Sequence, residues 1–104
     1  MDDTTVRIIR LILPMRSRPT MYFGEKSYRT LQAFLFGVRM GMEKDAYDNS
    51  LWKKIEMHVI EKCFDNDIMS RPQEEGFDMF VAYFEETLRK YYWEQLPEEI
   101  TKYI

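Results

Sequence analysis

The chain is poor in the residues that build covalent or metal-bound frameworks. It contains one cysteine, Cys63, and one histidine, His58, among 104 residues. A lone cysteine excludes an internal disulfide and suits a reducing compartment. A structural zinc site normally takes four cysteine or histidine ligands, and one helix does not aim positions 58 and 63 at the same point. We therefore expect no metal site, a partly exposed His58 and an inert Cys63 in the core.

Long apolar segments are also missing. The longest apolar run, from Ile8 to Met15, is interrupted by Arg10 and Pro14, so it falls short of the roughly 20 residues that span a bilayer. No secretory signal peptide is expected, because acids follow Met1 where that signal carries lysines. These absences predict a soluble, cytoplasmic protein without contact to a membrane.

Catalytic signatures are absent as well. The four glycines form no phosphate-binding loop, and no GxSxG elbow or other catalytic motif occurs. Neighbouring carboxylates such as Glu85 and Glu86 point apart on a helix, whereas acid–base hydrolysis needs two carboxylates held in different environments. We expect a protein that is not an enzyme and that binds no cofactor.

What the chain does contain is a strong helical repeat of apolar residues. With 45% hydrophobic and 15% aromatic residues, its length fits a single domain over residues 1–104. No alternating pattern of a strand with a turn partner is found. We predict an all-α, compact single-domain bundle of four main helices plus a short C-terminal helix. The expected spans are residues 3 or 4 to 13, 27–44, 50–64, 74–94, and a short helix beginning at Pro97.

Several positions in this pattern carry specific expectations. Gly37 and Gly41, four residues apart, predict close approach of a neighbouring helix that offsets a helix-propensity loss of about 1 kcal/mol per glycine. The stripe of the fourth helix extends to Tyr91, and the run Tyr91-Tyr92-Trp93 fits either the core or an adhesive surface patch. The pattern alone does not choose between them.

The connection from Arg18 to Ser27 is richer in aromatic and special residues than an ordinary loop. Pro19 and Gly24 are expected to set the path of the chain into the second helix, which Ser27 caps. The residues between them, 21–23, form the sequence Met-Tyr-Phe and are expected to fold onto the core.

The net charge of −3 conceals an asymmetry. Residues 1–42 carry seven basic and three acidic groups, which gives +4, whereas the remaining 15 acids and 8 bases give −7. An acidic region disfavours direct binding of nucleic acid and attracts a basic protein. The alternative interpretation is a solvated surface that only keeps the protein in solution.

The first part of the chain resembles a known group of proteins. An opening apolar helix is followed by two motifs, Arg18-Pro19-x-Met21-Tyr22-x-Gly24-x-Lys26-Ser27 and Leu31-x-Ala33-Phe34-Leu35-x-Gly37. Over roughly residues 5–40 this pattern is similar to small bacterial immunity proteins of polymorphic and contact-dependent growth inhibition toxin systems. The resemblance implies a cytoplasmic antitoxin that binds the C-terminal domain of one cognate toxin in a 1:1 complex. Such toxins are commonly nucleases, with a ribonuclease favoured, and the immunity protein blocks the active site or substrate groove.

The charge pattern agrees with that expectation, because a nuclease groove that attracts phosphate is basic and an acidic protein can occupy the same field. We expect Tyr47 to be an aromatic anchor of the toxin-binding surface, surrounded by carboxylates. The expected toxin-binding residues are Glu43, Asp45, Tyr47, Asp48, Asp65, Asp67, Glu74, Glu75 and Asp78. Under the alternative, these acids only cap helices and maintain solubility.

Two other functions remain open from the sequence. An interaction or regulatory module that uses the basic N-terminal third, in association with nucleic acid, predicts that five arginines cluster on one surface. These are Arg7, Arg10, Arg16, Arg18 and Arg29. A helical enzyme subunit predicts a deep pocket enclosing polar groups from different helices.

Overall fold

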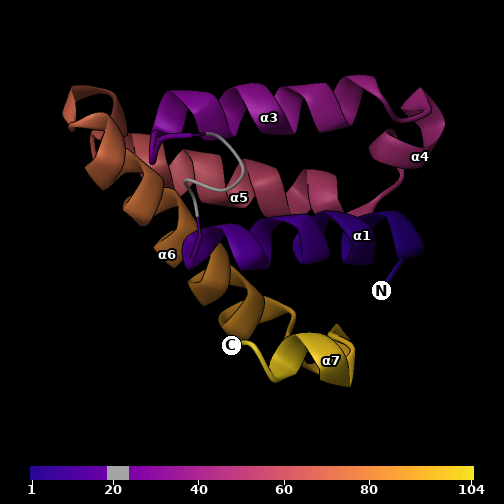
Figure 1. Ribbon diagram of the computed structural model, residues 1–104. Coiled ribbons are helices and arrows are strands. Elements are labelled where there is room, and N and C mark those ends of the chain that lie inside the picture. Colours follow the sequence, from indigo (N-terminus) through magenta and orange to yellow (C-terminus); the bar gives the residue numbers. More distant parts are fainter. Residues whose placement is uncertain (19–23) are drawn as a thin grey trace.

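The computed structural model describes residues 1–18 and 24–104, and these residues form helices without any strand. Figure 1 shows α3 lying above α5 and α1, with α6 crossing at one end. The four long helices and the short C-terminal α7 confirm the predicted all-α architecture. The elements are α1 (Asp3–Ile12), η1 (Leu13–Arg16), α3 (Tyr28–Met40), α4 (Lys44–Asp48), α5 (Leu51–Asp65), η2 (Ile68–Ser70), α6 (Gln73–Tyr91), η3 (Trp93–Gln95) and α7 (Glu98–Thr101).

One carboxylate, that of Asp2, caps backbone N–H groups at the start of both α1 and α5. The side chain of Asp2 accepts hydrogen bonds from the backbone N–H of Thr5 and of Leu51, each at 2.9 Å. The buried Thr5 hydroxyl donates to Asp2 and accepts from the Trp52 N–H at 2.8 Å. Asp2 is therefore the N-cap of α1, and the helix begins at Asp3, within the expected start at residue 3 or 4. The Asp2 carboxylate and the Thr5 hydroxyl thus accept hydrogen bonds from free N–H groups at the start of two helices that are distant in sequence.

The second helix begins where expected and ends early. Ser27 is its N-cap and accepts from the Thr30 N–H at 3.4 Å. The expected extension to residue 44 is wrong, because α3 ends at Met40 and Gly41 is its C-cap. Glu43 is extended and α4 follows, so the chain turns back toward α5 and brings Tyr47 into the core.

The close approach predicted at Gly37 and Gly41 is wrong. A Cβ at Gly37 would meet nothing within 4 Å, and at Gly41 only backbone atoms of residues 37 and 38. The crowded glycine is Gly76 on α6, where an added Cβ would lie 3.0 Å from the Cβ of Tyr28. Close packing of α3 on α6 therefore depends on Gly76.

The hydrophobic core lies between α1, α3, α5 and α6. Trp52 packs on Phe84 with ring centroids 5.7 Å apart, and Tyr28 packs on Phe80 at 6.3 Å. Its fully buried large side chains are Trp52, Phe77, Phe80, Phe84, Ile8, Ile9, Ile12, Met15, Leu31, Ile55, Ile68 and Leu88. The apolar stripes read from the sequence supply most of this core.

The end of the fourth long helix differs from expectation. α6 ends at Tyr91 rather than near residue 94, because the backbone leaves the helical region at Tyr92 and turns through η3. This turn brings Leu96 and Ile100 into the core. Tyr91 is 51% exposed and Trp93 43%, whereas Tyr92 packs against the core. The first and last residues of the aromatic run therefore belong to the surface.

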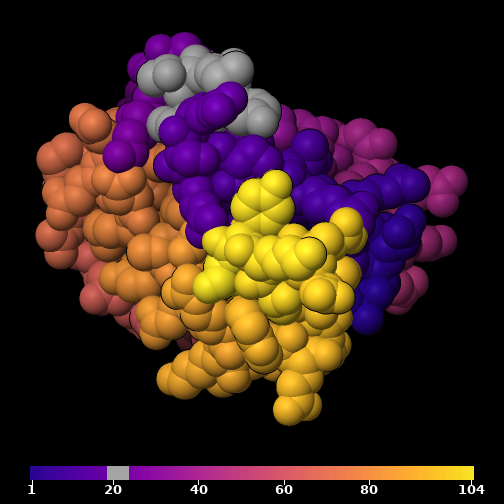
Figure 2. Space-filling view, turned by 60° about the horizontal axis from the view of Figure 1, so that its bottom comes forward, coloured from indigo at the N-terminus to yellow at the C-terminus, as the bar shows by residue number. Residues whose placement is uncertain are grey.

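The two ends of the described chain lie together. Figure 2 shows the C-terminal residues in yellow against the N-terminal segment in indigo and violet. Arg10 pairs with Glu99, and Arg16 pairs with Glu85 and donates to the Tyr103 carbonyl. The Arg10–Glu99 pair joins α7 to α1, whereas Arg16 joins η1 to α6 and to the residue Tyr103 that follows α7.

Two further observations complete the fold. The packing expected for residues 21–23, and the part of Pro19 in setting the path of the chain, lie outside the described residues. Gly24 has φ +73°, a left-handed conformation that glycine adopts readily, at the turn into the second helix. Over the same described ranges, no helix is long and apolar enough to cross a membrane.

Candidate protein-binding surfaces

The acidic residues expected to bind a partner lie in two groups at opposite ends of α5 (Figure 1). The 15 residues of α5 separate the groups by about 22 Å at 1.5 Å per residue. One group, here called the α4 end, contains Glu43, Asp45 and Asp48; the other, the α6 end, contains Asp65, Asp67, Glu74, Glu75 and Asp78. All eight side chains are exposed. The fold therefore presents two acidic surfaces where the sequence was interpreted as one.

Tyr47 does not have the expected role of an exposed anchor. Only 5% of it is exposed, and its hydroxyl donates to Glu56 at 3.2 Å. The guanidinium of Arg39 lies over its ring, 4.9 Å from the centroid. In this structure the Tyr47 side chain holds α4 to the body of the protein and leaves little of its ring for a partner, so a toxin contact at this position stays a prediction.

Glu56 is the centre of a polar cluster that the sequence did not reveal. It accepts hydrogen bonds from Tyr47 and from Trp52 Nε1, the latter at 3.1 Å. Burial raises the pKa of Glu56, although these hydrogen bonds offset part of that effect. Burial and then the nearby Glu56 raise the pKa of Tyr47. The i, i+4 spacing of Trp52 and Glu56 was the only local signal, and the cluster joins α3, α4 and α5.

The α4 end is nearly neutral. Asp48 pairs with Lys53 at 3.6 Å, whereas Glu43 and Asp45 form no ion pair within the described part of the chain. Arg39 at the end of α3 and Lys44 on α4 line one hollow together with Asp48, and Lys53 lies on α5. Three acids against three cations leave no net charge at this end.

The α6 end is more acidic. Asp78 pairs with Lys26 at 2.6 Å, and Glu75 pairs with Arg71 at 3.1 Å. Asp65 and Glu74 form no ion pair with any described residue. Five acids, set against the three nearby cations Lys26, Arg29 and Arg71, give this end a net charge of −2.

Apolar side chains accompany these acids. Phe64, in the last turn of α5, is 55% exposed, and Met69, in η2 between α5 and α6, is 70% exposed. Met69 also lines a hollow of about 290 Å³ together with Tyr28 and Gln32. The Nε2 of Gln32 is buried without a hydrogen-bond acceptor among described atoms. Phe64 follows the core position Cys63 and falls outside the apolar stripe of α5, so it was not among the residues expected to bind a partner.

The arginines of the N-terminal third are largely engaged. Arg7 pairs with Asp3 at 3.5 Å, Arg10 with Glu99 and Arg16 with Glu85. Arg18 and Arg29 are exposed. Because carboxylates neutralise three of the five arginines expected to cluster, this third of the chain offers less positive charge than its composition indicates.

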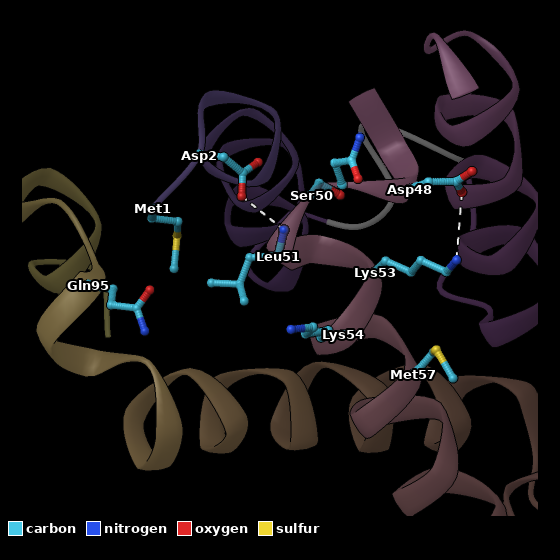
Figure 3. Close-up of a pocket in the computed structure, with 10 residues that line it drawn as sticks. Met1, Asp2, Asp48, Ser50, Leu51, Lys53, Lys54, Met57 and Gln95 are labelled. Carbon is cyan, nitrogen blue, oxygen red and sulfur yellow. Dashed lines mark hydrogen bonds and ion pairs between the residues drawn. The ribbon is translucent and has the colours of Figure 1, made fainter. Parts of the chain in front are cut away.

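A pocket of about 570 Å³ lies between the starts of α1 and α5 and η3 (Figure 3). Polar residues from several elements line it, as an enzyme subunit would require. Asp2, however, caps Leu51, and Lys53 pairs with Asp48. These polar groups satisfy one another, so the visible contacts are helix caps and an ion pair.

His58 and Cys63 occupy the environments expected for them. His58 is exposed and its ring packs at a tilt against Tyr91, with ring centroids 4.8 Å apart and an interplanar angle of 56°. Cys63 is fully buried, and burial raises the pKa of its thiol to about 11. No group of metal-binding side chains converges within residues 1–18 and 24–104. Comparison of the chain with protein-family models, curated proteins and solved structures found no significant match.

Proposed function

We propose that this chain is an immunity protein that binds and neutralises the C-terminal domain of one cognate toxin. The proposal rests on the resemblance over roughly residues 5–40 and on the surface of the α6 end. The toxin domain it fits is a basic nuclease, with a ribonuclease favoured, and inhibition is stoichiometric and needs neither catalysis nor a cofactor.

The observation that carries the proposal is the composition of the α6 end. Protein interfaces concentrate binding energy in a few apolar or aromatic anchors surrounded by a polar rim. Phe64 and Met69 are exposed apolar side chains, and the five carboxylates of the α6 end lie on the same and the adjoining elements.

The charges suggest how such a complex forms. A negative surface accelerates encounter with a basic nuclease, and this effect weakens as salt screens the charges. Once bound, the immunity protein excludes nucleic acid from the groove of the nuclease, because its carboxylates occupy the positive field that otherwise attracts phosphate. We place the contact at the α6 end because its net charge is more negative than that of the α4 end.

The protein encoded by the neighbouring gene allows the proposal to be tested directly. If it encodes a large secreted protein with a variable C-terminal domain, that domain should be toxic when expressed alone in the cytoplasm. Co-expression with this chain should restore growth and give a 1:1 complex on purification. Continued toxicity in the presence of folded protein would refute the proposal.

Two charge reversals locate the contact. Asp65→Lys places a cation in the last turn of α5, where the helix dipole favours it, so the fold is expected to be retained. It should slow association with the toxin domain by about 10-fold at low salt. Asp45→Lys makes the same change in charge at the α4 end and should have a much smaller effect. A larger effect of Asp45→Lys would move the contact to the α4 end.

A further inference from the structure

The segment that joins α5 to α6, residues 66–71 and here called the α5–α6 turn, lies at one end of the bundle (Figure 1). It holds two neighbouring apolar residues in opposite environments. Ile68 is 2% exposed and anchors the turn in the core, whereas Met69 is 70% exposed. The turn is therefore fixed to the body of the protein at one residue and presents the next one to solvent.

Hydrogen bonds hold the backbone of this turn in one shape. Asp67 has φ 60° and ψ 44°, a left-handed conformation that residues other than glycine adopt rarely. The Ser70 hydroxyl donates to the Asp67 carboxylate at 2.6 Å, and the Ser70 N–H donates to the Asp67 carbonyl at 3.2 Å. The Arg71 N–H donates to the Ile68 carbonyl at 3.1 Å. These bonds close the backbone on both sides of Met69.

The surroundings of Met69 combine a recess with negative charge. The residue lines a hollow of about 290 Å³, of which the buried Tyr28 and Ile68 are also part. The carboxylates of Asp65 and Asp67 are exposed nearby in the sequence, and neither forms an ion pair with a described residue. Binding energy in interfaces concentrates at apolar anchors with a recess beside them and a polar rim around them. The sign of this rim fits a basic partner.

We propose that the α5–α6 turn is a pre-organised recognition element, and that Met69 enters an apolar pocket with a basic rim on the toxin domain. This inference rests on the proposed function and assigns separate parts of the contact to separate steps. The carboxylates set the rate of association, whereas the buried anchor sets the rate of dissociation. Because the turn already has its bound shape, binding orders little additional backbone.

The free protein tests the pre-organisation. Order parameters of the backbone N–H groups of residues 68–70, from NMR relaxation, should be about 0.85, as in rigid backbone. Ser70→Ala removes the hydroxyl that holds the Asp67 carboxylate and should lower them, whereas Ser70→Thr keeps the hydroxyl and should leave them unchanged. Wild-type values below about 0.6, the range of flexible segments, would overturn the inference.

Dissociation of the complex tests the anchor. The complex is formed with the purified C-terminal domain encoded by the neighbouring gene. Met69→Ala should raise its dissociation rate at least about 10-fold and leave its association rate nearly unchanged, because no charge is altered. Met57→Ala is the matched control, since Met57 is 63% exposed but lies on α5 outside the turn. It should dissociate like wild type.

Ser70→Ala should also speed dissociation, by about 5-fold, because a loosened turn must be ordered again on binding. Ser70→Thr should restore the wild-type rate. A complex whose dissociation is insensitive to Met69→Ala, or equally sensitive to Met57→Ala, would overturn this inference and leave the proposed function standing. Absence of a complex with the wild-type protein would overturn both.

Discussion

The shared capping of α1 and α5 gives a sharp stability prediction at Thr5. This residue is fully buried, and its hydroxyl donates to Asp2 and accepts from the Trp52 N–H at 2.8 Å. Thr5→Val keeps the shape but removes both hydrogen bonds. The Trp52 N–H is then left without a partner at the start of α5, where no helical carbonyl can reach it.

The expected loss follows from these two bonds. A buried N–H without an acceptor destabilises a protein by about 1–3 kcal/mol, and the added methyl returns less than about 1 kcal/mol through burial. We therefore expect a net loss of about 2 kcal/mol, or a fall in Tm of about 10 °C for a domain of this size. Urea denaturation should show a lower midpoint with an unchanged slope.

Thr87→Val provides a control matched in chemistry and burial. Thr87 is also buried, but its hydroxyl donates to the Tyr83 carbonyl within α6, and that carbonyl accepts a backbone hydrogen bond as well. Its replacement should change the free energy of unfolding by less than about 0.5 kcal/mol. Equal losses for the two variants would refute the capping argument, because burial and side-chain shape alone would then explain them.

Three other predictions concern glycines, acid stability and the thiol. Gly37→Ala should stabilise the protein by up to about 1 kcal/mol, because its Cβ would meet no atom within 4 Å. Gly76→Ala should destabilise it by about 1–3 kcal/mol, because its Cβ would lie 3.0 Å from that of Tyr28. Thermal melts with the reverse order would contradict the packing. Burial raises the pKa of Asp2, but hydrogen bonds from Leu51 and Thr5 outweigh it and bring the pKa below its ordinary value of 3.8. The ionised Asp2 carboxylate therefore stabilises the fold above pH 3.8, and this stabilisation is lost as the pH falls through the lower pKa of the folded state. Asp2→Asn should therefore make the free energy of unfolding fall less steeply at acidic pH. An unchanged dependence on pH in that range would contradict the prediction. Cys63, buried with a thiol pKa of about 11, should react with a thiol reagent only upon unfolding, and rapid labelling of the native protein would contradict its burial.

The helices were predictable because their apolar stripes repeat at the helical period and their start signals are local. Ser27 caps α3 as expected. The helix ends that were predicted wrongly depend on tertiary contacts. α3 ends at Met40, and the turn that follows brings Tyr47 to Glu56. α6 ends at Tyr91, and the turn that follows buries Leu96. No local pattern in the sequence contains those distant partners.

The candidate surface was predictable only as composition. The sequence shows that the second part of the chain is acidic, but the length of α5 separates Asp45 from Asp65 and divides the predicted site into two. Tyr47 resembled an exposed anchor because polar residues surround it in the sequence, whereas its ring is covered through Arg39 and Glu56. Phe64 is exposed because it lies off the apolar stripe of α5, whereas the exposure of Met69 depends on the turn between α5 and α6, which no local pattern specifies.

The central claim is that this chain neutralises a basic toxin domain through its α6 end. The most direct test is the association rate between the purified chain and the C-terminal domain encoded by the neighbouring gene, measured for wild type, Asp65→Lys and Asp45→Lys at low and high salt. We predict a 1:1 complex whose association slows about 10-fold in Asp65→Lys, little in Asp45→Lys, and less at high salt. Absence of a complex, or association unaffected by Asp65→Lys at low salt, would contradict the account.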